Sequence, residues 1–147
     1  MGSVVQINIG PFGEVPAPVE RVEAHAGKGL AGNRYFFEHG AKPGQALTLI
    51  AAEALDGLAA EHGIELSAAE SRRNVLTRGI DLNALVGRRF RVGDVECEGV
   101  ELCEPCKDLE RATQPGVIKG LLHRGGLNAD ILTDGVISVG DEVVEST

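Results

Sequence analysis

Two cysteines in the segment Leu102–Leu109 are the residues best suited to chemistry in this sequence. Cys103 and Cys106 are separated by a Glu-Pro pair. A thiolate is both a nucleophile and a soft metal ligand, and the N-terminus of a helix favours its formation. Pro105 suits the first position of a helix expected from Cys106 to about Ala112, which would place Cys106 in the first turn. The sequence therefore predicts an accessible thiol at Cys106.

The same cysteines allow three other interpretations. Cys106 could be a buried, inert thiol, which is a common state of free cysteine. A reversible disulfide could join Cys103 to Cys106. A structural zinc site would need two more ligands, for which Cys97 and His123 are the candidates nearest in sequence. Cys97 is expected to face the packed side of the preceding hairpin.

Arginines are concentrated in one part of an otherwise acidic chain. The net charge of −8 argues against a general binder of nucleic acid or of anionic membranes. Asp81 is nevertheless the only acid in a short segment that contains Arg72, Arg73, Arg78, Arg88, Arg89 and Arg91. Arg72 and Arg73 could clamp a phosphate, or they could form surface ion pairs with Glu70 and Asp81. The pattern favours a small anionic ligand, whose pocket could also be lined by Arg34, Tyr35, Arg124 and Asn128.

A glycine-rich loop is expected over residues 27–35. Its glycines allow the backbone to turn tightly or to approach another group closely. The loop has neither the Gly-Lys-Ser/Thr ending of a Walker loop nor the glycine spacing of a dinucleotide fold. A phosphate cradle and an ordinary surface connection are both compatible with this pattern.

Short strands dominate the expected secondary structure. They are expected at residues 4–9, 19–26, 45–50, 74–77, 88–92, 95–102, 127–132, 136–139 and 142–144. Short helices are expected at residues 52–62, 81–86 and 115–123, with another opened by the capping pattern at residues 67–70. Gly63 should end the first of these helices, and Asp81 should cap the second. The pairs 88–92 with 95–102 and 136–139 with 142–144 should form hairpins. With no βαβ rhythm evident, the chain is predicted to be a single mainly β, barrel-like domain over residues 1–147 with short helical insertions.

The composition fits a globular protein with an aliphatic core. Hydrophobic residues make up 43% of the chain, but aromatics only 3%, which argues against base stacking on aromatic platforms. No apolar run is long enough to span a membrane, and no signal peptide is evident. An odd number of cysteines without an export signal suits a reducing compartment, so a cytoplasmic location is expected.

The order of motifs resembles the MOSC family, which is named after the C-terminal domain of molybdenum cofactor sulfurase. The chain is similar to a stand-alone, minimal member of that family. The segments that carry the resemblance are Gly29–Tyr35, Ser71–Val75, Asp81–Gly87, Glu104–Leu109, Arg124–Ala129 and Gly135–Asp141. They follow the family's order over nearly the whole chain. Asn33 departs from the pattern, because the family has Asp in the corresponding Gly-Asp-Arg.

The resemblance implies a β-barrel-like fold and a specific role for Cys106. The family's Pro-Cys-x-x-Leu pattern falls on Pro105, Cys106 and Leu109, so Cys106 would ligate molybdenum or carry sulfur as a persulfide. The contacts implied for the molybdenum cofactor are Arg34, Arg72, Arg73, Asn74, Arg124 and Asn128. Reduction of N-hydroxylated substrates, with a redox or sulfur-transfer protein partner, is the activity implied. The alternatives are a non-catalytic binding module and a thiol-redox protein that uses Cys103 and Cys106.

Overall fold

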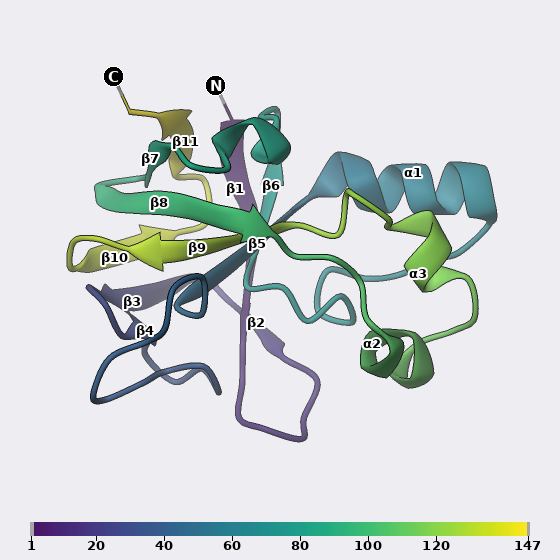
Figure 1. Cartoon of the computed structure of the whole chain (residues 1–147), viewed down its shortest axis with the longest axis horizontal. Coiled ribbons are helices and arrows are strands. Elements are labelled where there is room, and N and C mark those ends of the chain that lie inside the picture. Colours follow the sequence, from purple (N-terminus) through teal and green to yellow (C-terminus); the bar gives the residue numbers. More distant parts are fainter. Residues whose placement is uncertain (1, 147) are drawn as a thin grey trace.

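The structure, a computed structural model, describes residues 2–146 and is rich in short strands (Figure 1). The strands are β1 (Gly2–Ile9), β2 (Ala17–Val19), β3 (Arg21–His25), β4 (Gly29–Leu30), β5 (Leu47–Ala51), β6 (Val75–Arg78), β7 (Arg89–Val92), β8 (Val95–Leu102), β9 (Leu127–Ile131), β10 (Gly135–Ser138) and β11 (Glu142–Glu145). The helices are α1 (Ala52–His62), α2 (Lys107–Ala112) and α3 (Val117–Gly120), together with the 3₁₀ helix η1 (Leu82–Leu85).

A closed barrel is the centre of the fold. Within residues 2–146, eight strands form one sheet in the order β11-β7-β8-β9-β5-β6-β1-β2. β11 also pairs with β1, which sets Gly2 opposite Val143 and closes the sheet, while β2 pairs only with β1. Side chains alternate between the interior and the outside, so that Val95 and Cys97 on β8 are buried while Glu96 between them is not. The predicted barrel-like, mainly β fold is confirmed.

A smaller sheet shares the core of the barrel. Its strands run in the order β10-β3-β4 and lie beside β9 (Figure 1). Val22 on β3, Leu30 on β4 and Ile137 on β10 belong to the same buried cluster as Phe90 on β7. The core is therefore one aliphatic cluster around a single phenylalanine, as the low aromatic content predicts.

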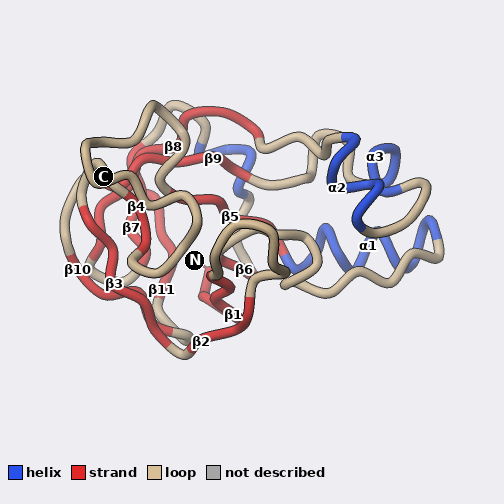
Figure 2. The backbone as a smooth tube through the Cα atoms, turned by 90° about the horizontal axis from the view of Figure 1, so that it is seen from below, coloured by secondary structure: helices blue, strands red, loops and turns tan. Residues whose placement is uncertain are grey.

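The three α-helices form a separate group on one side of the barrel, whereas η1 lies against the strands (Figures 1 and 2). Leu58 of α1, Leu109 of α2, and Val117 and Leu121 at α3 pack into their own buried cluster. Gly63 has a left-handed φ of 63° and ends α1, as predicted. In the described part of the chain, no helix has the length and apolar character needed to cross a membrane.

One prediction about strand pairing is wrong. β10 and β11 form where strands were expected, but β10 pairs with β3 while β11 pairs with β7 and β1, so they are not a hairpin. The turn at Gly140 and Asp141 instead passes the chain from one sheet to the other. In addition, β5 and β6 pair in parallel and α1 lies between them in the sequence, so these three elements form one βαβ unit. A unit that occurs once gives no rhythm in the sequence.

The predicted capping box forms, but the helix expected after it does not. The Ser67 N–H donates to Glu70 Oε1 at 3.0 Å, and the Glu70 N–H donates to Ser67 Oγ at 3.1 Å. The Ser71 hydroxyl then donates to the Ala68 carbonyl at 2.5 Å, and Arg72 adopts a left-handed φ of 63°. This conformation ends the turn and directs the chain into β6.

The glycine-rich loop is partly a strand. Gly29 and Leu30 are buried in β4 and pair with β3. A Cβ atom on Gly29 would lie 2.5 Å from the Tyr35 carbonyl oxygen, so glycine is needed where the backbone folds back on itself. The consequence is that Arg34 and Tyr35 are held at a fixed place beyond the strand.

Candidate functional site

Cys106 lies at the start of α2, which begins one residue later than predicted. The helix begins at Lys107, and Cys106 is its N-cap residue, with extended backbone angles and a carbonyl that accepts the Glu110 N–H at 3.1 Å. The buried Pro105 therefore precedes the cap and is not the first helical residue. The Cys106 thiol is exposed and makes no capping hydrogen bond, so it is free to react or to bind.

The other two cysteines differ from Cys106 in their surroundings. Cys103 follows β8 and is half-buried; burial raises the pKa of its thiol, while the nearby Arg73 charge partly opposes that rise. Cys97 is fully buried in the barrel, as predicted, and burial raises its pKa to about 12. All three are free thiols, and the described residues include no group of three His, Cys, Asp or Glu side chains placed to hold a metal.

Arg73 holds the cysteine loop in place. Its Nε donates to the Gly125 carbonyl at 2.8 Å, and Nη2 donates to the Cys103 carbonyl at 3.1 Å. The side chain is buried, and its remaining contacts are the carbonyls of Ser71 at 3.3 Å and Glu104 at 3.5 Å. The guanidinium thus joins the segment after β8 to the turn before β9 through three backbone carbonyls, and its contact with Ser71 ties both to the segment before β6.

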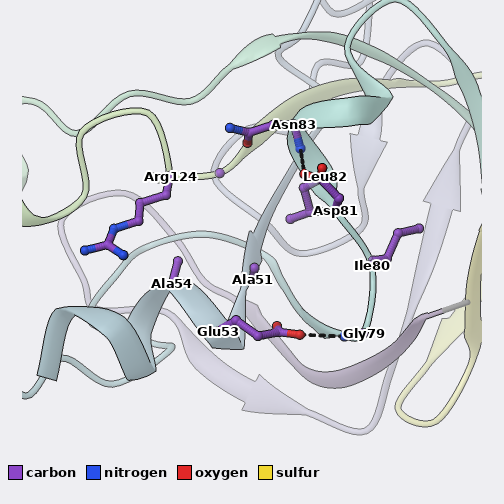
Figure 3. A pocket seen from close by; sticks show the side chains of 10 residues that line it. Ala51, Glu53, Ala54, Gly79, Ile80, Asp81, Leu82, Asn83 and Arg124 are labelled. Atoms are coloured by element: carbon purple, nitrogen blue, oxygen red, sulfur yellow. Dashed lines mark hydrogen bonds between the residues drawn. The ribbon is translucent and has the colours of Figure 1, made fainter. Parts of the chain in front are cut away.

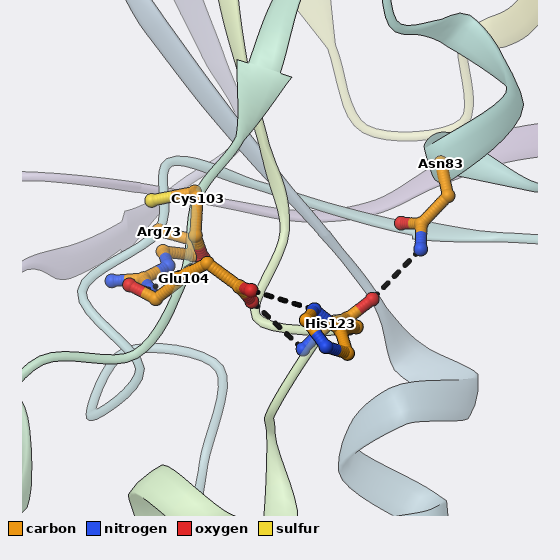
Figure 4. A network of polar contacts seen from close by, with 5 residues as sticks. All are labelled: Arg73, Asn83, Cys103, Glu104 and His123. Carbon is orange, nitrogen blue, oxygen red and sulfur yellow. Dashed lines mark hydrogen bonds and ion pairs between the residues drawn. The ribbon is translucent and has the colours of Figure 1, made fainter.

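A second contact fixes the other side of the same loop (Figure 4). Glu104 accepts the His123 backbone N–H at 2.7 Å and lies 2.8 Å from His123 Nδ1. The Asn83 side chain donates to the His123 carbonyl at 2.7 Å and so ties the turn to η1. Figure 4 shows the Cys103 sulfur pointing away from His123.

Arg72 and Arg34 carry charges without acidic partners. Within residues 2–146, neither they nor Arg73 forms a salt bridge, and the predicted alternative of pairing with Glu70 and Asp81 does not occur. Arg34 donates weakly to a backbone carbonyl at 3.4 Å and lies over the Tyr35 ring. Burial lowers the pKa of Arg34, the charges of Arg72 and Arg73 lower it further, and Tyr35 opposes them. Such repulsion between cations is relieved by a bound anion.

These residues meet in one cavity of about 440 Å³. Eight residues named in the sequence analysis line it, namely Arg34, Tyr35, Arg72, Arg73, Cys103, Cys106, Leu109 and Asn128. They come from five separate segments of the chain, between β4 and β5, before β6, after β8, at the start of α2, and on β9. The cavity combines a thiol, several cations and the Asn128 amide, and its volume is in the range of sites for small molecules.

Two of the predicted contacts lie elsewhere. Asn74 is buried beside the cavity, where its amide donates to the Asn8 carbonyl at 3.1 Å and its oxygen accepts the Thr48 hydroxyl at 3.1 Å. It joins β1, β5 and β6 and does not line the cavity. Arg124 binds the Gly120 carbonyl and Glu61, each at 2.8 Å, and faces a different hollow.

That second hollow has a volume of about 490 Å³ and lies between α1 and η1 (Figure 3). Its polar groups are already used in local contacts. Glu53 accepts the Gly79 N–H at 2.8 Å, and Asp81 caps η1 by accepting the Asn83 N–H at 3.1 Å. The hollow therefore offers fewer free polar groups than the cavity at Cys106.

The sequence analysis missed Phe12, Thr48, Asp108 and Gln45 in the lining of the first cavity. Phe12 carried a recognisable signal, because it is an aromatic residue inside a Gly-Pro-Phe-Gly turn in a chain with few aromatics. The others are ordinary polar residues whose convergence depends on the barrel.

Comparisons with known proteins agree with the fold described above. The MOSC domain model matches residues 37–144 of the chain. The YuaD protein of Bacillus subtilis has a similar structure, with a TM-score of 0.83 and 18% identity over 100% of this chain and 97% of its own. YiiM from Geobacillus stearothermophilus has a TM-score of 0.76 and 18% identity over 100% of this chain and 76% of its own. YiiM from Escherichia coli gives 0.68 and 17% over 99% and 70%. No curated protein sequence gives a significant match.

Proposed function

The chain belongs to the MOSC domain family, and we propose that its cavity binds a phosphate-bearing ligand of the molybdenum-cofactor type. The observation that carries this proposal is the convergence of Arg34, Arg72 and Arg73 on the cavity that Cys106 also lines. None of these arginines has a carboxylate partner within the described chain. A phosphate would supply the missing negative charge.

The side chains present fit the two parts of the cofactor, its phosphate and its molybdenum. Arg72 and Arg34 would hold the phosphate, because their guanidinium groups retain free donors in the cavity. The Cys106 thiol is the exposed soft ligand that molybdenum accepts. When bound, the cofactor would supply two-electron redox chemistry, for which N-hydroxylated compounds are the proposed substrates.

Arg73 has a different part in this proposal. Four of its five N–H groups already donate to backbone carbonyls, so it contributes mainly its charge and the position of the cysteine loop. Asn128 also lines the cavity and offers an amide. A protein partner that delivers electrons or sulfur stays a prediction.

The test is elemental analysis of protein expressed in cells that make the cofactor. We expect stoichiometric molybdenum in the unaltered protein and its loss in Cys106→Ser and Arg72→Gln. Arg91→Gln is the matched control, because Arg91 is an exposed arginine on β7 that does not line the cavity. Molybdenum retained equally by all three variants would contradict the proposed site.

Thiol chemistry is a second candidate, because Cys103 and Cys106 line the same cavity. In sulfur carriage, the Cys106 thiolate would attack the outer sulfur of a donor persulfide, forming Cys106–S–SH and releasing the donor thiolate. In redox cycling, Cys103 and Cys106 would each lose a hydrogen to a disulfide-bearing partner. A persulfide-specific label on Cys106 in protein without molybdenum would support the first reaction, and a Cys103–Cys106 disulfide would support the second.

A further inference from the structure

Most of the aromatic residues of this chain lie in two neighbouring loops. The chain has four Phe and one Tyr, and Phe90 is the one buried in the barrel core. Phe12 lies in the loop between β1 and β2, and Tyr35, Phe36 and Phe37 lie in the loop after β4. The low overall aromatic content argued against stacking platforms, but it did not show that the few rings present are gathered in one place.

The two loops are held together by their backbones. The Arg34 N–H donates to the Gly10 carbonyl at 2.8 Å, and the Gly10 N–H donates to Asn33 Oδ1 at 3.3 Å. The rings of Phe12 and Tyr35 therefore meet edge to face, with centroids 5.6 Å apart and planes at 81°. Tyr35 is also stacked near Phe37, at 6.4 Å and 28°.

Both meeting rings line the cavity that holds the arginines and Cys106, and both remain exposed to solvent. Phe12 keeps 71% of its surface exposed and Tyr35 keeps 39%. The guanidinium of Arg34 lies 5.4 Å from the centre of the Tyr35 ring. Covering an apolar ring that is exposed beside a cationic cavity with another apolar surface lowers the free energy.

We infer that Phe12 and Tyr35 form a stacking subsite for a planar ring, so that the ligand or substrate is an aromatic anion. Its negative group would lie at Arg34 and Arg72, and its ring would stack on the exposed Phe12 ring and stand nearly perpendicular to Tyr35. This inference rests on the proposed function, because it assumes that the arginines bind the anion.

A small ligand fits the surroundings of these rings better than a protein surface does. The rings are continuous with the charged cavity, and its volume of about 440 Å³ accommodates a ring together with a phosphate. A protein interface of this kind would have to cover Arg34 and Arg72 with apolar atoms and leave their charges unpaired.

The test compares two phosphates of similar size, of which only one has an aromatic face. Phenyl phosphate and cyclohexyl phosphate are titrated into the protein by calorimetry, with inorganic phosphate as the reference. We expect phenyl phosphate to bind several-fold to about tenfold more tightly than cyclohexyl phosphate, which is the range measured for aromatic pairs beyond area burial. Phe12→Leu should reduce this ratio to about one.

The control is Val15→Ala. Val15 is an exposed apolar residue of the same loop that does not line the cavity, so its removal should leave the ratio unchanged. Equal binding of the two organic phosphates by the unaltered protein would overturn the inference. If the two organic phosphates bind equally while inorganic phosphate binds and Arg72→Gln weakens that binding, the aromatic subsite alone is overturned and the anion site remains. If none of the three phosphates binds, the proposed anion site fails and the subsite fails with it.

Discussion

Arg73→Lys separates the structural role of this arginine from a role in ligand binding. The guanidinium reaches two backbone segments in different directions, through Nε to Gly125 at 2.8 Å and through Nη2 to Cys103 at 3.1 Å. A lysine keeps the charge, but its single ammonium group cannot follow this fork. Hydrogen bonds from charged groups contribute about 1.5–3 kcal/mol each, and lysine can replace one of the two short bonds. The expected loss of unfolding free energy is therefore about 2 kcal/mol.

Urea unfolding followed by circular dichroism measures this loss, since the chain has no tryptophan to serve as a fluorescent probe. For a chain of this size, a loss of about 2 kcal/mol lowers the melting temperature by about 4–8 °C. Arg72→Gln is the matched control, because the Arg72 side chain forms no hydrogen bond or salt bridge within residues 2–146. Its unfolding free energy should change by less than about 0.5 kcal/mol. If Arg73→Lys is as stable as the unaltered protein, the loop is held by other contacts and our reasoning is wrong.

Three further predictions concern the thiols and the turn that packs against them. Burial raises the pKa of Cys97 to about 12, so only the unfolded state loses this proton as the pH rises above about 9. The free energy of unfolding should therefore fall by up to about 1.4 kcal/mol per pH unit, and Cys97→Ala should reduce this dependence on pH. Iodoacetamide should modify the exposed Cys106 first, then Cys103, whose pKa is raised by burial, as peptide mass spectrometry can show. Gly125→Ala should cost about 1–3 kcal/mol in urea unfolding, because its Cβ would lie 2.5 Å from the Cys103 carbonyl oxygen.

Each of these has an outcome that would contradict it. An unchanged slope in Cys97→Ala would assign the alkaline loss of stability to other groups. Modification of Cys103 before Cys106 would mean that the loop opens in solution. A stable Gly125→Ala would show that the turn can move away from Cys103 without loosening the Arg73 contacts.

The sequence was most informative where a pattern depends on near neighbours in the chain. The hairpin of β7 and β8, the helix α1 with its Gly63 end, and the cap of η1 by Asp81 all form as predicted. Each depends on residues a few positions apart, so local chemistry decides the outcome. The convergence of Arg34 with Arg72 was also anticipated, but on the basis of the family resemblance and residue type.

The predictions that failed concern residues and strands whose partners lie far apart in the sequence. The sequence of β10 and β11 resembles a hairpin, yet each strand pairs in a different sheet, β10 with β3 and β11 with β7. Arg72 and Arg73 are adjacent and chemically identical, and both line the cavity, so no local pattern could show that Arg73 is bound to carbonyls while Arg72 keeps its donors free. Asn74 and Arg124 were expected in the site by type, but closer partners engage both.

The pairing of β1 with β11 has a consequence for how this protein is made. The seam joins residue 2 to residue 143, so β1 leaves the ribosome long before β11 and lacks this neighbour until β11 has been synthesised. Its open edge must remain unpaired or be shielded in the meantime, which exposes it to association with other chains. Contacts so distant in sequence also slow folding, because the chain must search for them. Translation, rather than the completed barrel, is therefore the stage at which this architecture is most vulnerable to aggregation.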